Sequence, residues 1–124
     1  MLTHEAAFSG FSVDDIAAAR DFYRDTLGVE LDEADNGLLQ LHLAGGHEAI
    51  VYPKPDHVPA AFTILNFAVA DIERAVDELT AAGVEMIRYE GFHQDRRGIS
   101  RNPAGPPIAW FTDPARNILA VLEG

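Results

Sequence analysis

The 124-residue sequence contains no cysteine. Disulfide bonds, thiolate metal sites and a cysteine nucleophile are therefore excluded. No apolar run approaches the roughly 18 residues that a membrane-spanning helix needs, and the first residues lack the basic start and apolar core of a signal peptide. We therefore expect a soluble, cytoplasmic protein that does not interact with membranes.

Basic residues are scarce as well. Nine lysines and arginines stand against 20 aspartates and glutamates, which gives a formal net charge of −11. Such a charge argues against binding nucleic-acid phosphates over a broad surface. The 48% hydrophobic and 23% charged residues are ordinary for a globular protein. The length is sufficient to bury one core, so we expect a single domain over residues 1–124.

A short pattern occurs twice in the chain. Residues 12–21 and 68–77 share the pattern V-x-D-I-x-x-A-x-D, and Gly-Val-Glu-Leu at 28–31 matches Gly-Val-Glu-Met at 83–86. An internal repeat constrains the architecture before any single element is assigned. Two copies predict two similar modules that face each other, with a binding site in the cleft between them.

Each module, about 6–53 and about 62–123, is predicted to have the order β-α-β-β-β. Apolar residues at three- and four-residue steps predict helices over 14–27 and 71–82, each with an aspartate as N-cap and a glycine after its end. Alternating or apolar segments and turn residues predict the strands. The predicted strands cover residues 6–13, 30–32, 38–43, 48–52, 62–69, 84–89, 108–112 and 117–122.

Two segments carry a resemblance to a known family. Residues 21–28, D-F-Y-R-D-T-L-G, resemble the F-Y-x-x-x-L-G signature of the vicinal oxygen chelate superfamily. Residues 109–117, A-W-F-T-D-P-A-R-N, resemble its F-x-D-P-x-G-N turn, with Arg116 where the family usually has glycine. The resemblance extends over essentially the whole chain. The superfamily includes glyoxalases, extradiol dioxygenases, fosfomycin-resistance enzymes and bleomycin-resistance proteins.

The resemblance implies an α+β fold. Its two modules would form a curved, mostly antiparallel, eight-stranded sheet around a cleft, with both helices outside. It also implies a homodimer. Metal-using members bind a divalent ion through four side chains, and the matching positions here are Phe8, Ile50, Ile64 and Ala120. Carbon side chains cannot coordinate a cation, so we expect neither a metal nor another cofactor.

The same positions predict where a small molecule binds. We expect them to form an apolar floor with aromatic walls, a few orienting polar groups, and a cover from the polar loop 91–107. The predicted ligand-binding residues are Phe8, His42, Ile50, Tyr52, Ile64, Asn66, Arg88, His93, Trp110 and Ala120.

Several of these residues also have a purely structural interpretation. The loop histidines are interpreted as solvated, whereas His42 lines either the cleft or the solvent-facing surface. The arginines at 88, 96, 97 and 101 either balance local charge or, with His93, meet an anionic ligand from a lid. Trp110 either faces the cleft or has a purely structural role. Phe111 points to the opposite face of the strand and is the expected core residue.

Two functions remain open. The first is a metal-free protein that binds a small molecule in an apolar aromatic cleft, as bleomycin-resistance proteins do. The second is a glyoxalase-like lyase, isomerase or dioxygenase whose metal ligands lie elsewhere, or a cofactor-free isomerase. No nucleophile motif or phosphate-binding glycine loop is present to decide between them.

Overall fold

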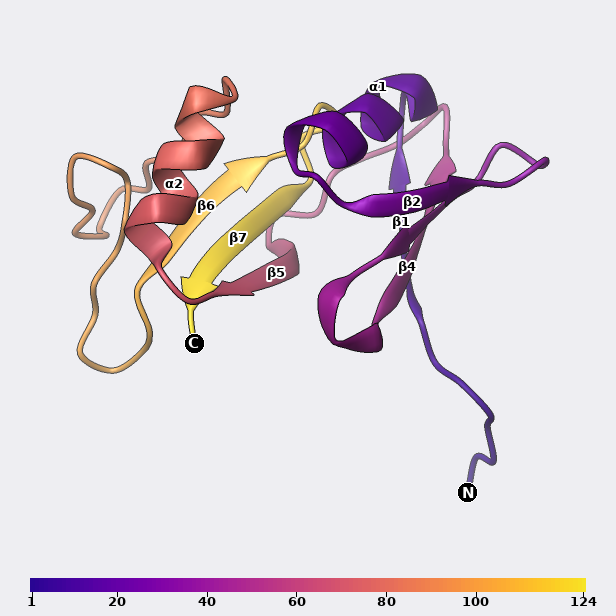
Figure 1. Ribbon diagram of the computed structural model, residues 1–124, viewed down its shortest axis with the longest axis horizontal. Coiled ribbons are helices and arrows are strands. Elements are labelled where there is room, and N and C mark those ends of the chain that lie inside the picture. The colour runs from indigo at the N-terminus through magenta and orange to yellow at the C-terminus, as the bar shows by residue number, and fades with distance from the viewer. The chain divides into compact units, whose positions relative to one another are not determined.

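A computed structural model describes residues 1–124, and the chain forms two compact units, Met1–Val58 and Pro59–Gly124 (Figure 1). We describe each unit by itself. The fold is α+β, as expected, with seven strands in two mixed sheets and two α-helices. Neither helix is long and apolar enough to cross a membrane.

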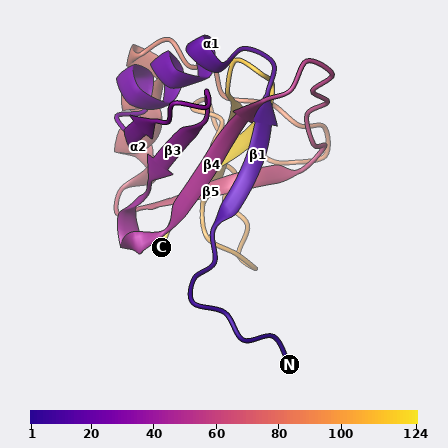
Figure 2. The same ribbon diagram turned by 90° about the vertical axis from the view of Figure 1, so that its right-hand side faces the viewer.

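The first unit holds a four-stranded sheet with the strand order β1-β4-β3-β2. Its strands are β1 (Ser9–Val13), β2 (Glu30–Glu33), β3 (Leu39–His42) and β4 (Glu48–Pro53), and its helical elements are α1 (Ile16–Asp21), the π-helix η1 (Phe22–Thr26) and the 3₁₀ turn η2 (Ala44–Gly46). The strands β1 and β4 run side by side in parallel (Figure 2), and the other pairs are antiparallel.

The second unit holds a three-stranded sheet with the order β5-β7-β6. Its strands are β5 (Thr63–Val69), β6 (Ile108–Thr112) and β7 (Ile118–Glu123), and its helix is α2 (Ile72–Ala81). The pair β5–β7 is parallel and β6–β7 is antiparallel. In both units, therefore, the first strand pairs in parallel with the last one.

Both helices begin in the same way. The side chains of Asp15 and Asp71 accept hydrogen bonds from the backbone N–H groups of Ala18 and Arg74, each at 3.1 Å. These bonds satisfy donors that have no partner inside the helix, which is why aspartate is favoured at this position. Asp15 and Asp71 are therefore the N-caps of α1 and α2.

Both helices are followed by a glycine in the left-handed region, Gly28 with φ 71° and Gly83 with φ 91°. The residue after each glycine donates its N–H back into the helix, to Tyr23 at 2.8 Å and to Leu79 at 2.9 Å. Glycine is suited to this geometry because it has no Cβ that would clash. The repeated glycines therefore fix where both helices stop.

The core of each unit lies between one face of its sheet and its helix. In the first unit the buried side chains include Val13, Tyr23, Leu41 and Val51. Tyr23 belongs to the F-Y-x-x-x-L-G segment and packs against Phe22 and Phe11, with ring centroids 5.4 and 5.9 Å apart. Each such buried side chain contributes about 1.5–3 kcal/mol through removal from water.

In the second unit Ile72 and Val76 of α2 are buried, as are Phe111 and Leu119 of the sheet. Figure 1 shows α2 lying over one face of this sheet. Phe111 is fully buried, which confirms its assignment to the core. Because neighbouring residues of a strand point to opposite faces, Trp110 lies on the other face, which α2 does not cover.

Three expectations differ from the structure. Residues 84–89 do not form a strand, so there are seven strands rather than eight. One hydrogen bond, from the N–H of Ile87 to the carbonyl of Trp110 at 2.8 Å, joins this segment to β6. A ladder does not follow, because the N–H of Tyr89 donates instead to the side chain of Gln94.

The helix predicted over 14–27 is α-helical only from Ile16 to Asp21 and continues as a π-helix to Thr26. Its i→i+5 bond runs from the N–H of Leu27 to the carbonyl of Phe22 at 2.9 Å. Apolar periodicity does not separate these two forms, since a single π turn shifts the stripe by only one residue. The sheets are also more mixed than the mostly antiparallel arrangement that we expected, because each has one parallel pair.

Candidate functional site

Three aromatic rings gather on the face of the second unit's sheet that α2 does not cover. We call this the open face of that sheet. Trp110 of β6 contacts Tyr89 with ring centroids 5.3 Å apart, and Phe92 at 5.4 Å, while Tyr89 and Phe92 are 5.9 Å apart. The rings meet edge-to-face or tilted, which is the favourable geometry for aromatic pairs. Phe92 is 53% exposed, so the cluster presents a ring to solvent. We call these three residues the aromatic cluster.

The sheet register places other predicted site residues on the same face. Ala120 of β7 is directly opposite both Trp110 of β6 and Asn66 of β5. Contrary to expectation, the register does not place Ile64 on this face, because the pairing of β5 with β7 shifts between Thr63 and Leu65 and the side-chain alternation is broken there. Ala120 is fully buried, whereas Asn66 is exposed and its side chain makes no hydrogen bond. The second unit therefore brings Trp110, Asn66 and Ala120 to one face, with Asn66 as a free polar group.

The segment that carries Tyr89 and Phe92 is held by side chains. Gln94 accepts from the N–H of Tyr89 at 2.8 Å and donates to the carbonyls of Ile87 at 2.8 Å and Gly98 at 2.9 Å. Arg88 donates to the carbonyls of Asp95 at 2.6 Å and Arg96 at 2.8 Å. These bonds give the loop a defined form, so that Phe92 is positioned over Trp110 rather than left to move freely.

The later part of loop 91–107 is anchored on α2. Arg97 binds both carboxylate oxygens of Asp77, at 2.9 and 3.2 Å, and Arg101 binds Glu73 at 2.8 Å. Since α2 covers the face opposite to Trp110, these residues do not lie on the open face. His93 is exposed and makes no hydrogen bond. The loop thus reaches the open face through Phe92, and Arg88 supports it from its root.

The open face of the first unit's sheet carries a row of polar side chains. His42 of β3 lies between two carboxylates, with Nε2 2.7 Å from Asp32 and Nδ1 3.2 Å from Glu48. Glu48 also accepts from Gln40 at 2.8 Å. The bond to Asp32 is the main cause that raises the pKa of His42, Glu48 adds to it, and partial desolvation opposes both. Because each ring nitrogen faces a carboxylate oxygen, the geometry favours the doubly protonated imidazolium.

Ile50 and Tyr52 of β4 share this face with His42. The register sets Ile50 opposite Gln40 and Gly10, and Tyr52 opposite Ser12. Tyr52 is 40% exposed. Phe8, just before β1, is 67% exposed. The first unit therefore brings His42, Ile50 and Tyr52 to one face, and Phe8 lies outside the paired residues.

Two loop histidines that we interpreted as solvated have defined partners. His57 lies 2.6 Å from the hydroxyl of Ser12 and is half-buried. His47 lies 3.0 Å from the hydroxyl of Ser9 and is exposed. Both bonds join β1 to chain segments that follow β3 and β4, so these histidines help to position the first strand. Sequence spacing gave no sign of either contact, since the partners are 45 and 38 residues apart.

The residues at the four positions that we expect, from the family resemblance, to match its metal ligands do not fit a metal ion. Phe8, Ile50, Ile64 and Ala120 offer only carbon atoms, which form no bonds to a dication. Elsewhere in the structure no group of three or more histidine, aspartate or glutamate side chains is arranged to hold a metal. His42 illustrates the reason, because its two nitrogens point toward different carboxylates.

Sequence reasoning missed two members of the aromatic cluster. Tyr89 was assigned to a strand and Phe92 to the loop, and neither was included among the ligand-binding residues. The available signal was their spacing around the turn at Glu90 and Gly91, where Gly91 adopts φ 84°. Two aromatic residues that flank such a turn can pack together, but only the bond from Ile87 to β6 brings them onto Trp110.

The chain belongs to the Glyoxalase/Bleomycin resistance protein/Dioxygenase superfamily, whose family model matches residues 5–121. This is the class that the strand order, the paired helix caps and the Asp113–Asn117 turn define. None of the curated proteins matches the chain.

Solved structures of low sequence identity share the fold. The fosfomycin resistance protein FosX from Listeria monocytogenes has a TM-score of 0.75 at 13% identity, with 99% of this chain and 95% of that chain covered. TnmS3, an antibiotic binding protein from Streptomyces sp. CB03234, has a TM-score of 0.70 at 22% identity, with 98% of each chain covered. A lactoylglutathione lyase from Agrobacterium tumefaciens has a TM-score of 0.67 at 22% identity, with 98% and 95% covered.

Proposed function

We propose that this protein binds a small organic molecule without a metal and holds it against the aromatic cluster of the second unit. The observation that carries the proposal is the half-exposed ring of Phe92 beside Trp110 and Tyr89. Flat aromatic surfaces give a large contact area to a planar ligand, and they keep little conformational freedom that binding would remove. The free amide of Asn66, on the same face, can orient the guest.

Two further facts support binding over metal-dependent catalysis. The four positions that would hold a metal carry only carbon atoms. The fold neighbours include an antibiotic binding protein, TnmS3, as well as a lactoylglutathione lyase. Fold alone does not choose between these activities, so the choice rests on the chemistry of the side chains.

Trp110 makes the proposal directly testable, because it is the only tryptophan in the chain. A thermal-shift screen over small aromatic, cationic and oxo-acid compounds would supply ligands, and quenching of the Trp110 emission would then report their binding at the aromatic cluster. We expect at least one planar compound to raise the unfolding temperature and to change this emission in a saturable way.

The matched variants are Phe92→Ala and Phe62→Ala. Both remove an exposed phenylalanine of the second unit, 53% and 68% exposed, but only Phe92 belongs to the cluster. We expect Phe92→Ala to weaken binding about fivefold or more, since an aromatic contact contributes about 1 kcal/mol beyond area burial, and Phe62→Ala to leave it unchanged. Equal binding by both variants would refute the assignment. Trp110→Ala deletes the central ring of the cluster, and Arg74→Ala is its surface control.

A further inference from the structure

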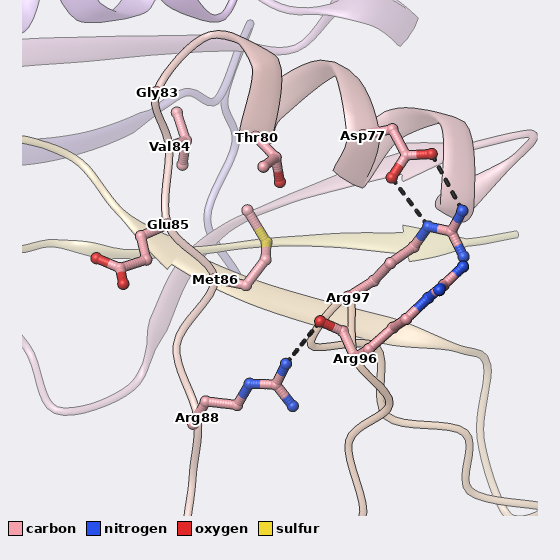
Figure 3. A pocket seen from close by; sticks show the side chains of 9 residues that line it. All are labelled: Asp77, Thr80, Gly83, Val84, Glu85, Met86, Arg88, Arg96 and Arg97. Carbon is pink, nitrogen blue, oxygen red and sulfur yellow. Dashed lines mark hydrogen bonds and ion pairs between the residues drawn. The ribbon is translucent and has the colours of Figure 1, made fainter.

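A pocket of about 680 Å³ lies at the end of α2, on the helix side of the second unit (Figure 3). Its volume falls within the range of roughly 300–1,000 Å³ that is usual for small-molecule sites. It is separate from the aromatic cluster, none of whose residues line it. The lining residues are Asp77, Thr80, Gly83, Val84, Glu85, Met86, Arg88, Arg96 and Arg97.

The apolar part of the lining is fixed in place. Val84 and Met86 are half-buried, and Figure 3 shows Met86 at the centre, with Thr80 on one side and the arginines on the other. The backbone of Gly98 packs on Met86 so closely that a Cβ at residue 98 would lie 2.7 Å from the Cβ of Met86. Gly98 also has φ 90°, which favours glycine. The floor of the pocket is therefore built by tight packing and is not a loose gap between loops.

The charge of the lining is opposite to that of the chain. Three guanidinium groups and two carboxylates line the pocket, so it carries one excess positive charge, whereas the whole chain has a net charge of −11. Arg97 is bound to Asp77, and Arg88 is bound to backbone carbonyls, which carry no net charge. Glu73 lies 3.9 Å from Arg97 and also pairs with Arg101, so the charge of Arg97 is balanced by nearby carboxylates. Arg96 is the guanidinium of the lining that forms neither a salt bridge nor a hydrogen bond.

Arg96 is the group available to a ligand. Seven of the nine basic side chains make hydrogen bonds within the chain, and Arg96 and Arg116 are the two that make none. The hydrogen bond from Arg97 is the main cause that lowers the pKa of Asp77, and the charge of Arg96 adds to the effect. The guanidinium groups of Arg97 and Arg96 therefore both lie near the carboxylate of Asp77, and that of Arg96 has no hydrogen-bond partner.

We propose that this pocket binds an organic carboxylate, with its apolar group against Val84 and Met86 and its carboxylate bound by Arg96. A guanidinium presents two parallel N–H donors that match the two oxygens of a carboxylate. Thr80 supplies a hydroxyl beside the apolar floor. This site is independent of the function proposed above, because it uses another face of the unit and none of the aromatic cluster.

The test is a titration of the whole protein with 2-naphthoate, followed by the backbone amide resonances of Thr80, Val84 and Met86. We expect saturable shifts at these residues and only weak effects from uncharged 2-naphthalenemethanol. Arg96→Gln should weaken naphthoate binding about tenfold, which is the usual effect of losing a charge-assisted hydrogen bond. Arg116→Gln is the matched control, since it removes the other unbonded guanidinium of the same unit, and it should change the affinity less than twofold.

Three outcomes would overturn the proposal. The first is the absence of saturable shifts at the pocket residues. The second is an equal loss of affinity in both variants, which would show that only the net charge matters. The third is a set of shifts confined to Trp110 and its neighbours, which would place the carboxylate at the aromatic cluster and support the proposed function while refuting the pocket. A fold control is the unfolding temperature of each variant, which we expect to remain near that of the parent.

Discussion

Asp113 and Asn117 are joined by three hydrogen bonds across a tight turn. The carboxylate of Asp113 accepts from the backbone N–H of Asn117 and from its side-chain amide, both at 2.9 Å, and each residue is only 3% exposed. The backbone N–H of Asp113 donates in turn to the carbonyl of Asn117 at 3.1 Å. This pair closes the connection between β6 and β7, and it sets the register that puts Trp110 opposite Ala120.

Asp113→Ala should therefore destabilise the protein strongly. The substitution removes the carboxylate that accepts from the backbone N–H and the side-chain amide of Asn117, both of which are buried. We therefore expect the free energy of unfolding to fall by about 2–3 kcal/mol. Urea unfolding followed by circular dichroism measures the change. Asp14→Ala removes an exposed carboxylate near α1 that makes no hydrogen bond, and it should change the stability by less than about 0.5 kcal/mol. Equal effects of the two variants would contradict this role of the turn.

Arg116 occupies the one non-glycine position with positive φ, at 68°. An L-residue with a Cβ is disfavoured there by about 1–2 kcal/mol, and the greater freedom of an unfolded glycine offsets part of the gain. Arg116→Gly should thus stabilise the protein by about 0.5–1 kcal/mol, measured by urea unfolding.

Arg74→Gly is the contrasting variant for this prediction. Arg74 lies within α2, at ordinary helical geometry, where glycine costs about 1 kcal/mol. The two Arg→Gly substitutions are expected to change stability in opposite directions. A loss of stability in Arg116→Gly would show that the arginine side chain matters more than the backbone conformation.

The His42 network predicts a pH dependence. Because the hydrogen bonds that His42 donates to Asp32 and Glu48 raise its pKa above that in the unfolded chain, the folded state binds the proton more tightly. The stabilisation that protonated His42 contributes is complete below about pH 6.5, the ordinary pKa of histidine. It is lost as the pH rises through the raised pKa of His42 in the folded state. An NMR titration should give His42 the raised pKa, and Asp32→Asn should lower it more than Glu48→Gln does.

Phe8, Ile50, Ile64 and Ala120 predict that the protein binds no divalent ion at the family's position. Protein purified without a histidine tag, analysed for bound metals, should contain less than stoichiometric amounts. Addition of Mn²⁺, Ni²⁺ or Zn²⁺ should not raise the unfolding temperature, since a metal that binds only the folded state would do so. A stoichiometric metal retained through chelator-free purification would contradict both this prediction and the metal-free function.

We also propose that the protein is a homodimer. Phe8, Val58 and Phe62 are 67%, 82% and 68% exposed, which is apolar surface that a symmetric partner can cover. Light scattering coupled to size exclusion should give about twice the chain mass of 13.5 kDa at micromolar concentration. A mass of one chain would refute the proposal. Phe8→Ser should shift the equilibrium toward the monomer, because it removes part of this exposed apolar surface.

The sequence predicted part of the aromatic face but neither the full aromatic cluster nor the pocket. Trp110, Asn66 and Ala120 could be assigned to one face because side chains alternate along a regular strand, whereas Ile64 could not, because β5 is irregular there. Tyr89 and Phe92 were not predicted, because their contact with Trp110 depends on a segment that stays irregular. The pocket beside Arg96 was equally hidden, since it requires Gly98 and Met86, 12 residues apart, to be in contact.

The sequence by itself determined the two helices with their aspartate caps and glycine ends, the α+β class, and the tight turn from Asp113 to Asn117. These features depend on backbone preferences and on side-chain chemistry, which act over a few residues. Only the tertiary structure decided which arginines are paired, that His42 lies between two carboxylates, and that residues 84–89 form no strand. These outcomes depend on which of several competing partners lies nearest, and distant segments supply those partners.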